Sequence, residues 1–227
     1  MTPIKQFLNR RIGLRETMAV IAVLLVLAFA GYGISKFVAA KILEARVRAL
    51  FPQVCDQIRQ QRQTVIAAIE AYRTRFGFYP PDHVLRRRPL LVDAVTNTLF
   101  YELAGVRYNP TYQLFEVRGM ESAESSFVKQ FLDCSGFTNC ADNDALVQRF
   151  LPAGFLPASQ VHDDPDVFAL GTLPYDASDW ELMMHFDTTS WRYVSTSPTN
   201  NPGKFDLWLE VKSKNQSITI GNWEAAR

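Results

Sequence analysis

The chain has 227 residues, of which 48% are hydrophobic and 12% aromatic, so it can bury a sizeable core and wholesale disorder is excluded. Its formal net charge of +1 argues against a protein that wraps nucleic acid by bulk electrostatics. The charge is unevenly spread, because the first fifteen residues carry no acid and four cations: Lys5, Arg10, Arg11 and Arg15. This length fits one membrane segment and one globular domain, with room for an insertion.

An uncharged apolar run follows this basic start. From Thr17 to Ser35 there are 19 positions without a charged residue, which as a helix span roughly 28 Å, close to the hydrocarbon thickness of a bilayer. A secretory signal peptide is the rival interpretation, but the run is long and no Ala-x-Ala site opens a mature domain after it. The basic leader predicts a cytoplasmic N-terminus and an exported remainder, although Lys36 and Lys41 on the far side weaken that rule.

The helical pattern continues beyond the apolar run. Apolar residues recur at steps of three, four or seven, which predicts a narrow stripe on one face of a long helix. They are Leu43, Val47, Leu50, Val54, Ile58, Val65, Ile69, Tyr72 and Phe76. Polar residues, Arg62 among them, are assigned to the other faces, and Gly77 is expected to end the helix. The sequence therefore predicts one helix, half in lipid and half laid across a globular domain.

The C-terminal part is predicted to form an antiparallel sheet. Residues 205–212 alternate between apolar and polar side chains, and a turn at 213–216 leads into a last strand at 217–223, so these two strands form a hairpin. Residues 112–117 and 191–194 are two further strand candidates. With the helix stripe as its core, the fold is predicted to be α+β. Two short helices are expected, at Ser122–Leu132 and Asp142–Leu151.

Three stretches resemble the type II secretion pseudopilins and type IV minor pilins. Residues 12–22 are similar to the pilin start, in which a basic leader precedes a glutamate and an apolar helix. Residues 68–80, which include Tyr72-Arg73, Gly77 and Tyr79-Pro80, resemble the end of the pseudopilin helix. Residues 204–208 and 218–223 resemble the final strands.

The resemblance implies a domain plan. It divides the chain into a basic leader at 1–11, a long helix at 12–76 with its transmembrane part at about 17–35, and a pilin-like globular domain at 77–227 with an insertion at about 120–190. That fold is a long N-terminal helix packed on a C-terminal antiparallel sheet. It places the chain in the cytoplasmic (inner) membrane as a single-pass protein, with the N-terminus inside and the globular domain periplasmic or extracellular.

The resemblance also implies a role and its residues. It predicts a non-enzymatic structural subunit of a pilus or pseudopilus, whose partners are other pilin-like subunits and the inner-membrane assembly machinery. Glu16 falls on the family's glutamate, which serves subunit assembly; an interfacial Glu16 paired with Arg15 is the alternative. With Glu16 in register, processing by a prepilin peptidase would fall between Arg11 and Ile12, whereas the family has glycine before the cut. An uncleaved protein, and a bitopic periplasmic binding or adaptor protein that joins no filament, therefore stay open.

The cysteines and polar clusters predict little chemistry. Cys134 and Cys140 flank a short glycine-containing loop and are expected to form a disulfide in an oxidising compartment, with two separate thiols as the alternative. The three histidines are far apart in the sequence, and hydrolase and phosphate-binding motifs are missing, so we expect no enzyme and no catalytic residues. Asp142 and Asp144 offer oxygen ligands that calcium could use. Some of the secretion pseudopilins that the chain resembles carry calcium near the C-terminus, but the terminal hairpin here has no aspartate between 211 and 223, so calcium is not supported and no cofactor or metal is expected. Residues 86–88, three arginines, are interpreted as a solvated loop rather than a nucleic-acid site.

Overall fold

The computed structural model describes residues 14–82, 98–118, 122–132, 134, 136–152, 158–161, 164–171, 186–188, 190–214 and 216–224. The leader at 1–11, the processing residues Arg11 and Ile12, the three histidines and the arginines at 86–88 lie outside these residues. The chain divides into two compact units, residues 1–49 and residues 50–227, and each is described by itself.

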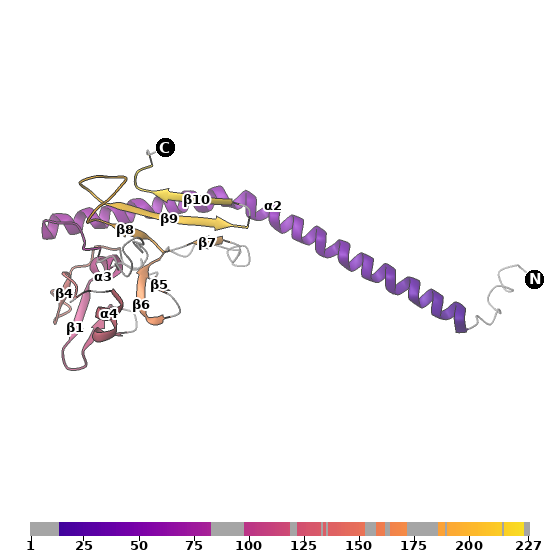
Figure 1. The fold of residues 1–227 in the computed structure, drawn as a ribbon, viewed down its shortest axis with the longest axis horizontal. Helices are drawn as coiled ribbons and strands as arrows, with labels where there is room; N and C mark the ends of the chain where they lie inside the picture. Colours follow the sequence, from indigo (N-terminus) through magenta and orange to yellow (C-terminus); the bar gives the residue numbers. More distant parts are fainter. Residues whose placement is uncertain are drawn as a thin grey trace, which may run out of the picture. The chain divides into compact units, whose positions relative to one another are not determined.

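Helix α2, Leu14–Phe76, is the longest element of the chain (Figure 1). It includes Pro52 without ending there. Its last turn gives way to Gly77, which has φ of 84° and donates its backbone N–H to the carbonyl of Arg73 at 2.8 Å. Glycine adopts this left-handed conformation without steric cost, so the helix ends where the sequence supplies the residue that permits the turn.

The part of α2 within the second unit supplies one wall of the core. Val54, Ile58, Val65, Ile69 and Tyr72 are all buried, and the last four have no exposed surface. Their spacing of three, four or seven residues puts them on one helix face. The predicted stripe is confirmed over this range.

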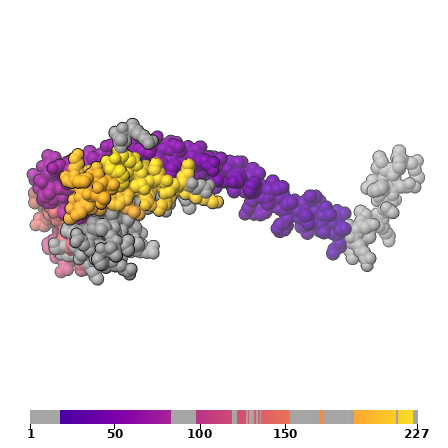
Figure 2. Space-filling model, turned by 45° about the horizontal axis from the view of Figure 1, so that its top comes forward, coloured from indigo at the N-terminus to yellow at the C-terminus, as the bar shows by residue number. Residues whose placement is uncertain are grey.

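The C-terminal sheet lies alongside α2 (Figure 2). Strand β9, Asp206–Ser213, pairs antiparallel with β10, Gln216–Gly221, in a register that joins Ser213 to Gln216 and Trp208 to Gly221. The other edge of β9 pairs with two short strands, β7, Phe186–Thr188, and β8, Arg192–Val194. The predicted terminal hairpin is confirmed, as is its buried face, which is formed by Leu207, Leu209 and Val211.

Residues from the middle of the sequence form a second sheet. It runs in the order β3, Ala123–Glu124; β2, Leu114–Glu116; β1, Val106–Asn109; and β4, Cys140–Ala141. All its pairs are antiparallel except β1 with β4, which is parallel. The short helices α3, Leu99–Ala104, and α4, Ser125–Leu132, accompany it, and β5, Ala158–Val161, pairs with β6, Asp164–Leu170.

The α+β class with a long N-terminal helix and antiparallel sheets is therefore confirmed. The helix predicted at Asp142–Leu151 is wrong, because the segment contains a turn and then irregular chain. The Asn143 side chain accepts the backbone N–H of Ala145, and the Asn139 side chain bonds both the N–H and the carbonyl of Gln148. These side chains occupy backbone groups that a helix would need.

Candidate functional site

The N-terminal part of α2 presents an apolar surface on every side. We call residues 18–35 the apolar stretch; each of them is exposed. The exposed fraction of its large hydrophobic side chains runs from 50% at Ile21, the lowest value, to 78% at Phe29, the highest. A helix that is apolar all round normally lies in a protein core or in lipid. Because this surface is uncovered, and because a window of α2 with mean hydropathy 2.3 meets the length and composition of a membrane span, the helix is a candidate membrane anchor.

The sequence-predicted assembly residue lies at the start of this surface. Glu16 is within α2, two residues before the apolar stretch. No charged residue occurs from Thr17 to Ser35, and the first cation beyond, Lys36, has its ammonium 4.9 Å from the ring centroid of Tyr32. The apolar stretch is thus bounded by a carboxylate-bearing residue at one end and by a cation at the other.

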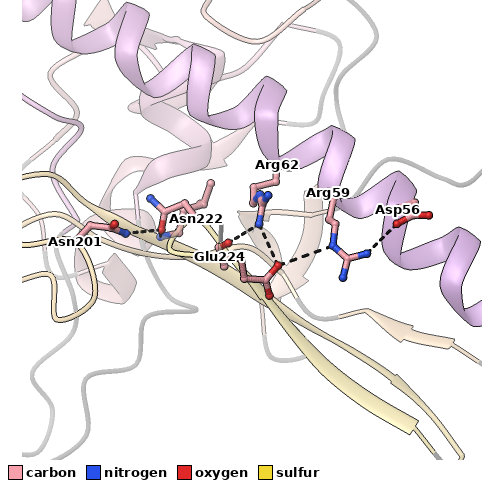
Figure 3. A network of polar contacts seen from close by, with 8 residues as sticks. Asp56, Arg59, Arg62, Asn201, Asn222 and Glu224 are labelled. Carbon is pink, nitrogen blue, oxygen red and sulfur yellow. Dashed lines mark hydrogen bonds and ion pairs between the residues drawn. The ribbon is translucent and has the colours of Figure 1, made fainter. Parts of the chain in front are cut away.

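A polar network fastens the C-terminus to the second half of α2 (Figure 3). Arg62 donates from Nη1 to the carbonyl oxygen of Gly221 at 2.5 Å, and the same nitrogen lies 3.3 Å from Oε2 of Glu224. Arg59 Nε lies 3.9 Å from the same carboxylate oxygen and also pairs with Asp56. We call Arg62, Gly221 and Glu224 the C-terminal clasp. Since the Arg62 side chain is only 6% exposed, water competes little for its bond to the Gly221 carbonyl.

The loop between β8 and β9 is bonded to Asn222, the residue that follows Gly221 of the clasp. The Asn222 amide oxygen accepts from Asn201 Nδ2 and from the backbone N–H of Leu207, and its amide nitrogen donates to the Phe205 carbonyl. The buried carboxylate of Asp206 accepts the backbone N–H groups of residues 199, 200 and 201, at 2.7 to 2.8 Å. Successive backbone N–H groups that converge in a turn form an anion-binding concavity, and here the chain's own carboxylate fills it.

A buried carboxylate joins α2 to the central sheet. Glu102 of α3 has no exposed surface and accepts the hydroxyl of Tyr72 and the backbone N–H groups of Thr138 and Asn139, each at 2.9 Å. Burial, and then the nearby Glu102 charge, raise the pKa of Tyr72 above the ordinary tyrosine value. Three donors from different parts of the fold bond this carboxylate. A buried acid needs such hydrogen bonds to offset the loss of water, so Glu102 has a structural role.

A third carboxylate fixes the chain after α2. Asp82 accepts the backbone N–H groups of Ser195 and Thr196 and the Thr196 hydroxyl, at 2.6 to 2.9 Å. Beside it, the hydroxyl of Tyr193 donates to the Pro80 carbonyl at 2.9 Å, and burial raises the pKa of Tyr193. These bonds anchor the segment that follows Gly77 to β8.

A comparison with protein-family models, with curated proteins and with solved structures finds no match to this chain.

The cysteine prediction is not supported. In the described part of the chain, which includes all three cysteines, no disulfide is formed. Cys134 is buried shortly after α4, whereas Cys140 is paired with Val106 in the second sheet, so the two residues belong to different local structures. Burial raises the pKa of the Cys55 thiol, which is buried within α2. Nor does that part of the chain hold a group of three or more His, Cys, Asp or Glu residues placed to bind a metal ion.

Sequence reasoning missed the residues that hold the domain together. Arg62 was assigned to a polar helix face, but it is 5% exposed, which corrects that assignment. The available signal was its spacing, four residues after Ile58 and three before Val65, within the period of the stripe. Glu102 had a signal too, since it stands alone among the apolar residues of Leu99–Ala104.

Proposed function

We propose that this chain is a non-enzymatic structural subunit of a pilus or pseudopilus, of the type II secretion or type IV pilus kind, that assembles through its hydrophobic N-terminal helix. The observation that carries the proposal is the apolar stretch, which is exposed on all sides and belongs to the same helix as the buried stripe of the globular unit. No Gly-, Ser- or Pro-rich linker separates the two parts in the sequence.

The apolar stretch must be covered by lipid or by other protein. Exposing this much apolar surface to water costs free energy, so lipid or protein is expected to cover the surface. Lipid covers it while the chain is a membrane protein. When the chain leaves the bilayer, helices of neighbouring subunits replace the lipid, and a helix apolar on every side can be surrounded by several neighbours at once.

The globular unit is firmly attached to the second part of α2. The C-terminal clasp fastens the end of β10 to Arg62 of α2, and Glu102 of α3 accepts the hydroxyl of Tyr72 of the same helix. The Asp82 bonds then hold the chain that follows α2 to the end of β8. A force applied to that part of the helix is therefore transmitted to the sheet without an intervening flexible segment. In this role the N-terminus lies in the cytoplasm, the helix in the inner membrane and the globular unit in the periplasm or outside the cell, where other pilin-like subunits and the inner-membrane assembly machinery are its partners.

Photocrosslinking in membranes tests the proposal. A photoreactive amino acid replaces Val26, which is 67% exposed in the apolar stretch, and in a matched control it replaces Tyr112, which is 72% exposed at a turn of the globular unit. The proposal predicts a ladder of products of this chain with itself or with another pilin-like chain from position 26. Only lipid adducts and monomers from position 26 would favour the adaptor that joins no filament.

Glu16 provides the second arm of the test. An unpaired carboxylate at the end of a membrane helix costs a few kcal/mol when drawn into lipid, so a neighbouring subunit's amine or basic side chain is its expected partner. Glu16→Ala is predicted to reduce the crosslinked ladder at least about tenfold while leaving the chain in the membrane fraction, because about 1.4 kcal/mol of lost pairing corresponds to that factor. The intact mass of the extracted chain shows in the same samples whether residues 1–11 are removed.

A further inference from the structure

A group of four cations follows the apolar stretch along α2. Lys36, Lys41, Arg46 and Arg48 are all exposed, and Glu44 is the one acid among residues 36–48, so this segment carries four positive charges minus one, a net +3. The whole chain carries only +1. We call the four cations the basic collar.

The cations of the collar surround the helix. Lys36, Lys41 and Arg46 are spaced five residues apart, so each is turned by about 140° from the one before, and together they point to all sides. An amphipathic helix that lies flat on a membrane carries its cations on one face. A collar on every side instead suits a helix that crosses the surface, where each side meets headgroups.

With the apolar stretch across the bilayer, as in the proposed function, the collar begins at the depth of the headgroups. Lys36 is the first charged residue after the apolar stretch, and its ammonium packs on the Tyr32 ring, a pairing suited to the interface, where tyrosine is enriched. The rise of ~1.5 Å per residue puts Lys41 about 8 Å beyond Lys36, and Arg48 about 18 Å beyond it. The first two cations therefore lie among headgroups, and the others lie within about one or two Debye lengths of them.

The ion pairs that Glu44 makes with two collar cations are exposed to solvent. Glu44 pairs with Lys41 at 3.1 Å and with Arg48 at 3.3 Å, but the two cationic side chains are 62% and 64% exposed. Exposed ion pairs of this kind contribute little free energy. The phosphate groups of lipids can therefore replace Glu44 as the partner of these cations.

We propose that the basic collar binds the headgroups of anionic phospholipids in the leaflet opposite the leader, an inference that rests on the membrane-anchoring part of the proposed function. Each cation near an anionic surface strengthens binding about fivefold. The collar thereby sets where the membrane segment ends, and it disfavours extraction of the helix until another subunit replaces the lipid.

Lipid selectivity of the full-length chain tests this proposal. The chain is purified in a non-ionic detergent, mixed with equimolar phosphatidylglycerol and phosphatidylcholine, and examined by native mass spectrometry for the ratio of the two lipids retained. The collar variant carries glutamine at all four collar positions. A control variant of equal charge change carries glutamine at four exposed cations of the globular unit: Arg75, Arg118, Lys204 and Lys214. A leader variant carries glutamine at Lys5, Arg10, Arg11 and Arg15.

The proposal predicts that the wild type and the control variant prefer phosphatidylglycerol, and that the collar variant loses this preference at least about tenfold, with salt weakening it in the wild type. A collar variant that keeps the wild-type preference, or a preference lost only in the leader variant, overturns the proposal while the membrane anchor stands. A wild type that retains neither lipid overturns the anchor as well. Circular dichroism of all variants confirms that the fold is kept.

Discussion

Arg62 in α2 and Gly221 at the end of β10 are 159 residues apart in the sequence and joined by a hydrogen bond of 2.5 Å. The donor is a buried guanidinium, and the acceptor is the carbonyl of a strand whose partner, β9, belongs to the core. A buried side chain therefore connects the helix to the last strand.

Replacing Arg62 should destabilise the globular unit. Arg62→Gln is too short to reach the Gly221 carbonyl and leaves buried polar groups without their partner, which costs about 2 kcal/mol. The full chain in detergent should show a urea midpoint lower by about 1 M, followed by tryptophan fluorescence. Arg75→Gln is the matched control, because Arg75 is an exposed cation of the same helix. Equal midpoints for the two variants would show that the clasp contributes nothing.

Glu102 should be equally sensitive to a neutral replacement. In Glu102→Gln an NH₂ group takes the place of one carboxylate oxygen and faces the N–H or O–H donors that now bond it. A buried donor left without an acceptor costs about 1–3 kcal/mol. The control is Glu124→Gln in β3, an exposed position. Urea unfolding of both variants is the measurement, and no difference between them would contradict the buried network.

The two buried tyrosines predict a loss of stability in alkali. Burial raises the pKa of Tyr72 and Tyr193 above the ordinary tyrosine value of 10.0. A raised folded-state pKa means that the unfolded chain releases its protons first, so the stabilisation is complete below pH 10 and is lost as the pH rises above it. Each tyrosine contributes a slope of up to about 1.4 kcal/mol per pH unit.

The variant Tyr193→Phe isolates one of these contributions. It loses the hydrogen bond to the Pro80 carbonyl, so it should be about 1 kcal/mol less stable at pH 8. Between pH 10 and 11 its stability should fall less steeply than that of the wild type, because one linked proton is missing. Urea titrations at pH 8, 10, 10.5 and 11 check this. If the free energy of unfolding falls equally steeply with pH in the variant and in the wild type, ionisation of Tyr193 does not contribute to the loss of stability.

Gly221 is predicted to be required for packing of the C-terminus. A Cβ at this position would lie 2.5 Å from the ring of Trp223, closer than two non-bonded carbon atoms can approach. Gly221→Ala should therefore displace the ring or shift the clasp, at a cost of about 1–3 kcal/mol. Gly33→Ala in α2 is the control, since a Cβ there meets nothing within 4 Å. Unchanged tryptophan emission and urea midpoint in Gly221→Ala would contradict the packing of Trp223.

The parts of the fold that local periodicity encodes were predictable. The stripe from Val54 to Tyr72 repeats at helical spacing, and residues 205–212 alternate at strand spacing, so both the helix and the hairpin follow from the sequence. Gly77, where the helix ends, is also a local signal. The α+β class results from these elements together.

What the sequence did not reveal depends on contacts between distant residues. The parallel pairing of Val106 with Cys140 joins residues 34 positions apart, and no local pattern specifies it. The segment Asp142–Leu151 looks helical by itself, but side-chain bonds from Asn139 and Asn143 hold it in another conformation. Arg62 is charged, and only the position of Gly221 and Glu224 makes its burial favourable.

The central claim, that copies of pilin-like helices meet along the apolar stretch, is tested most directly by a photocrosslinking scan through residues 24–32 of the full chain in its native membranes. Helices packed in a fixed orientation should give product yields that rise and fall with a period of three to four residues, and the products should contain this chain or another pilin-like chain. A uniformly low yield at every position, or products that contain only a protein of a different kind, would contradict the account.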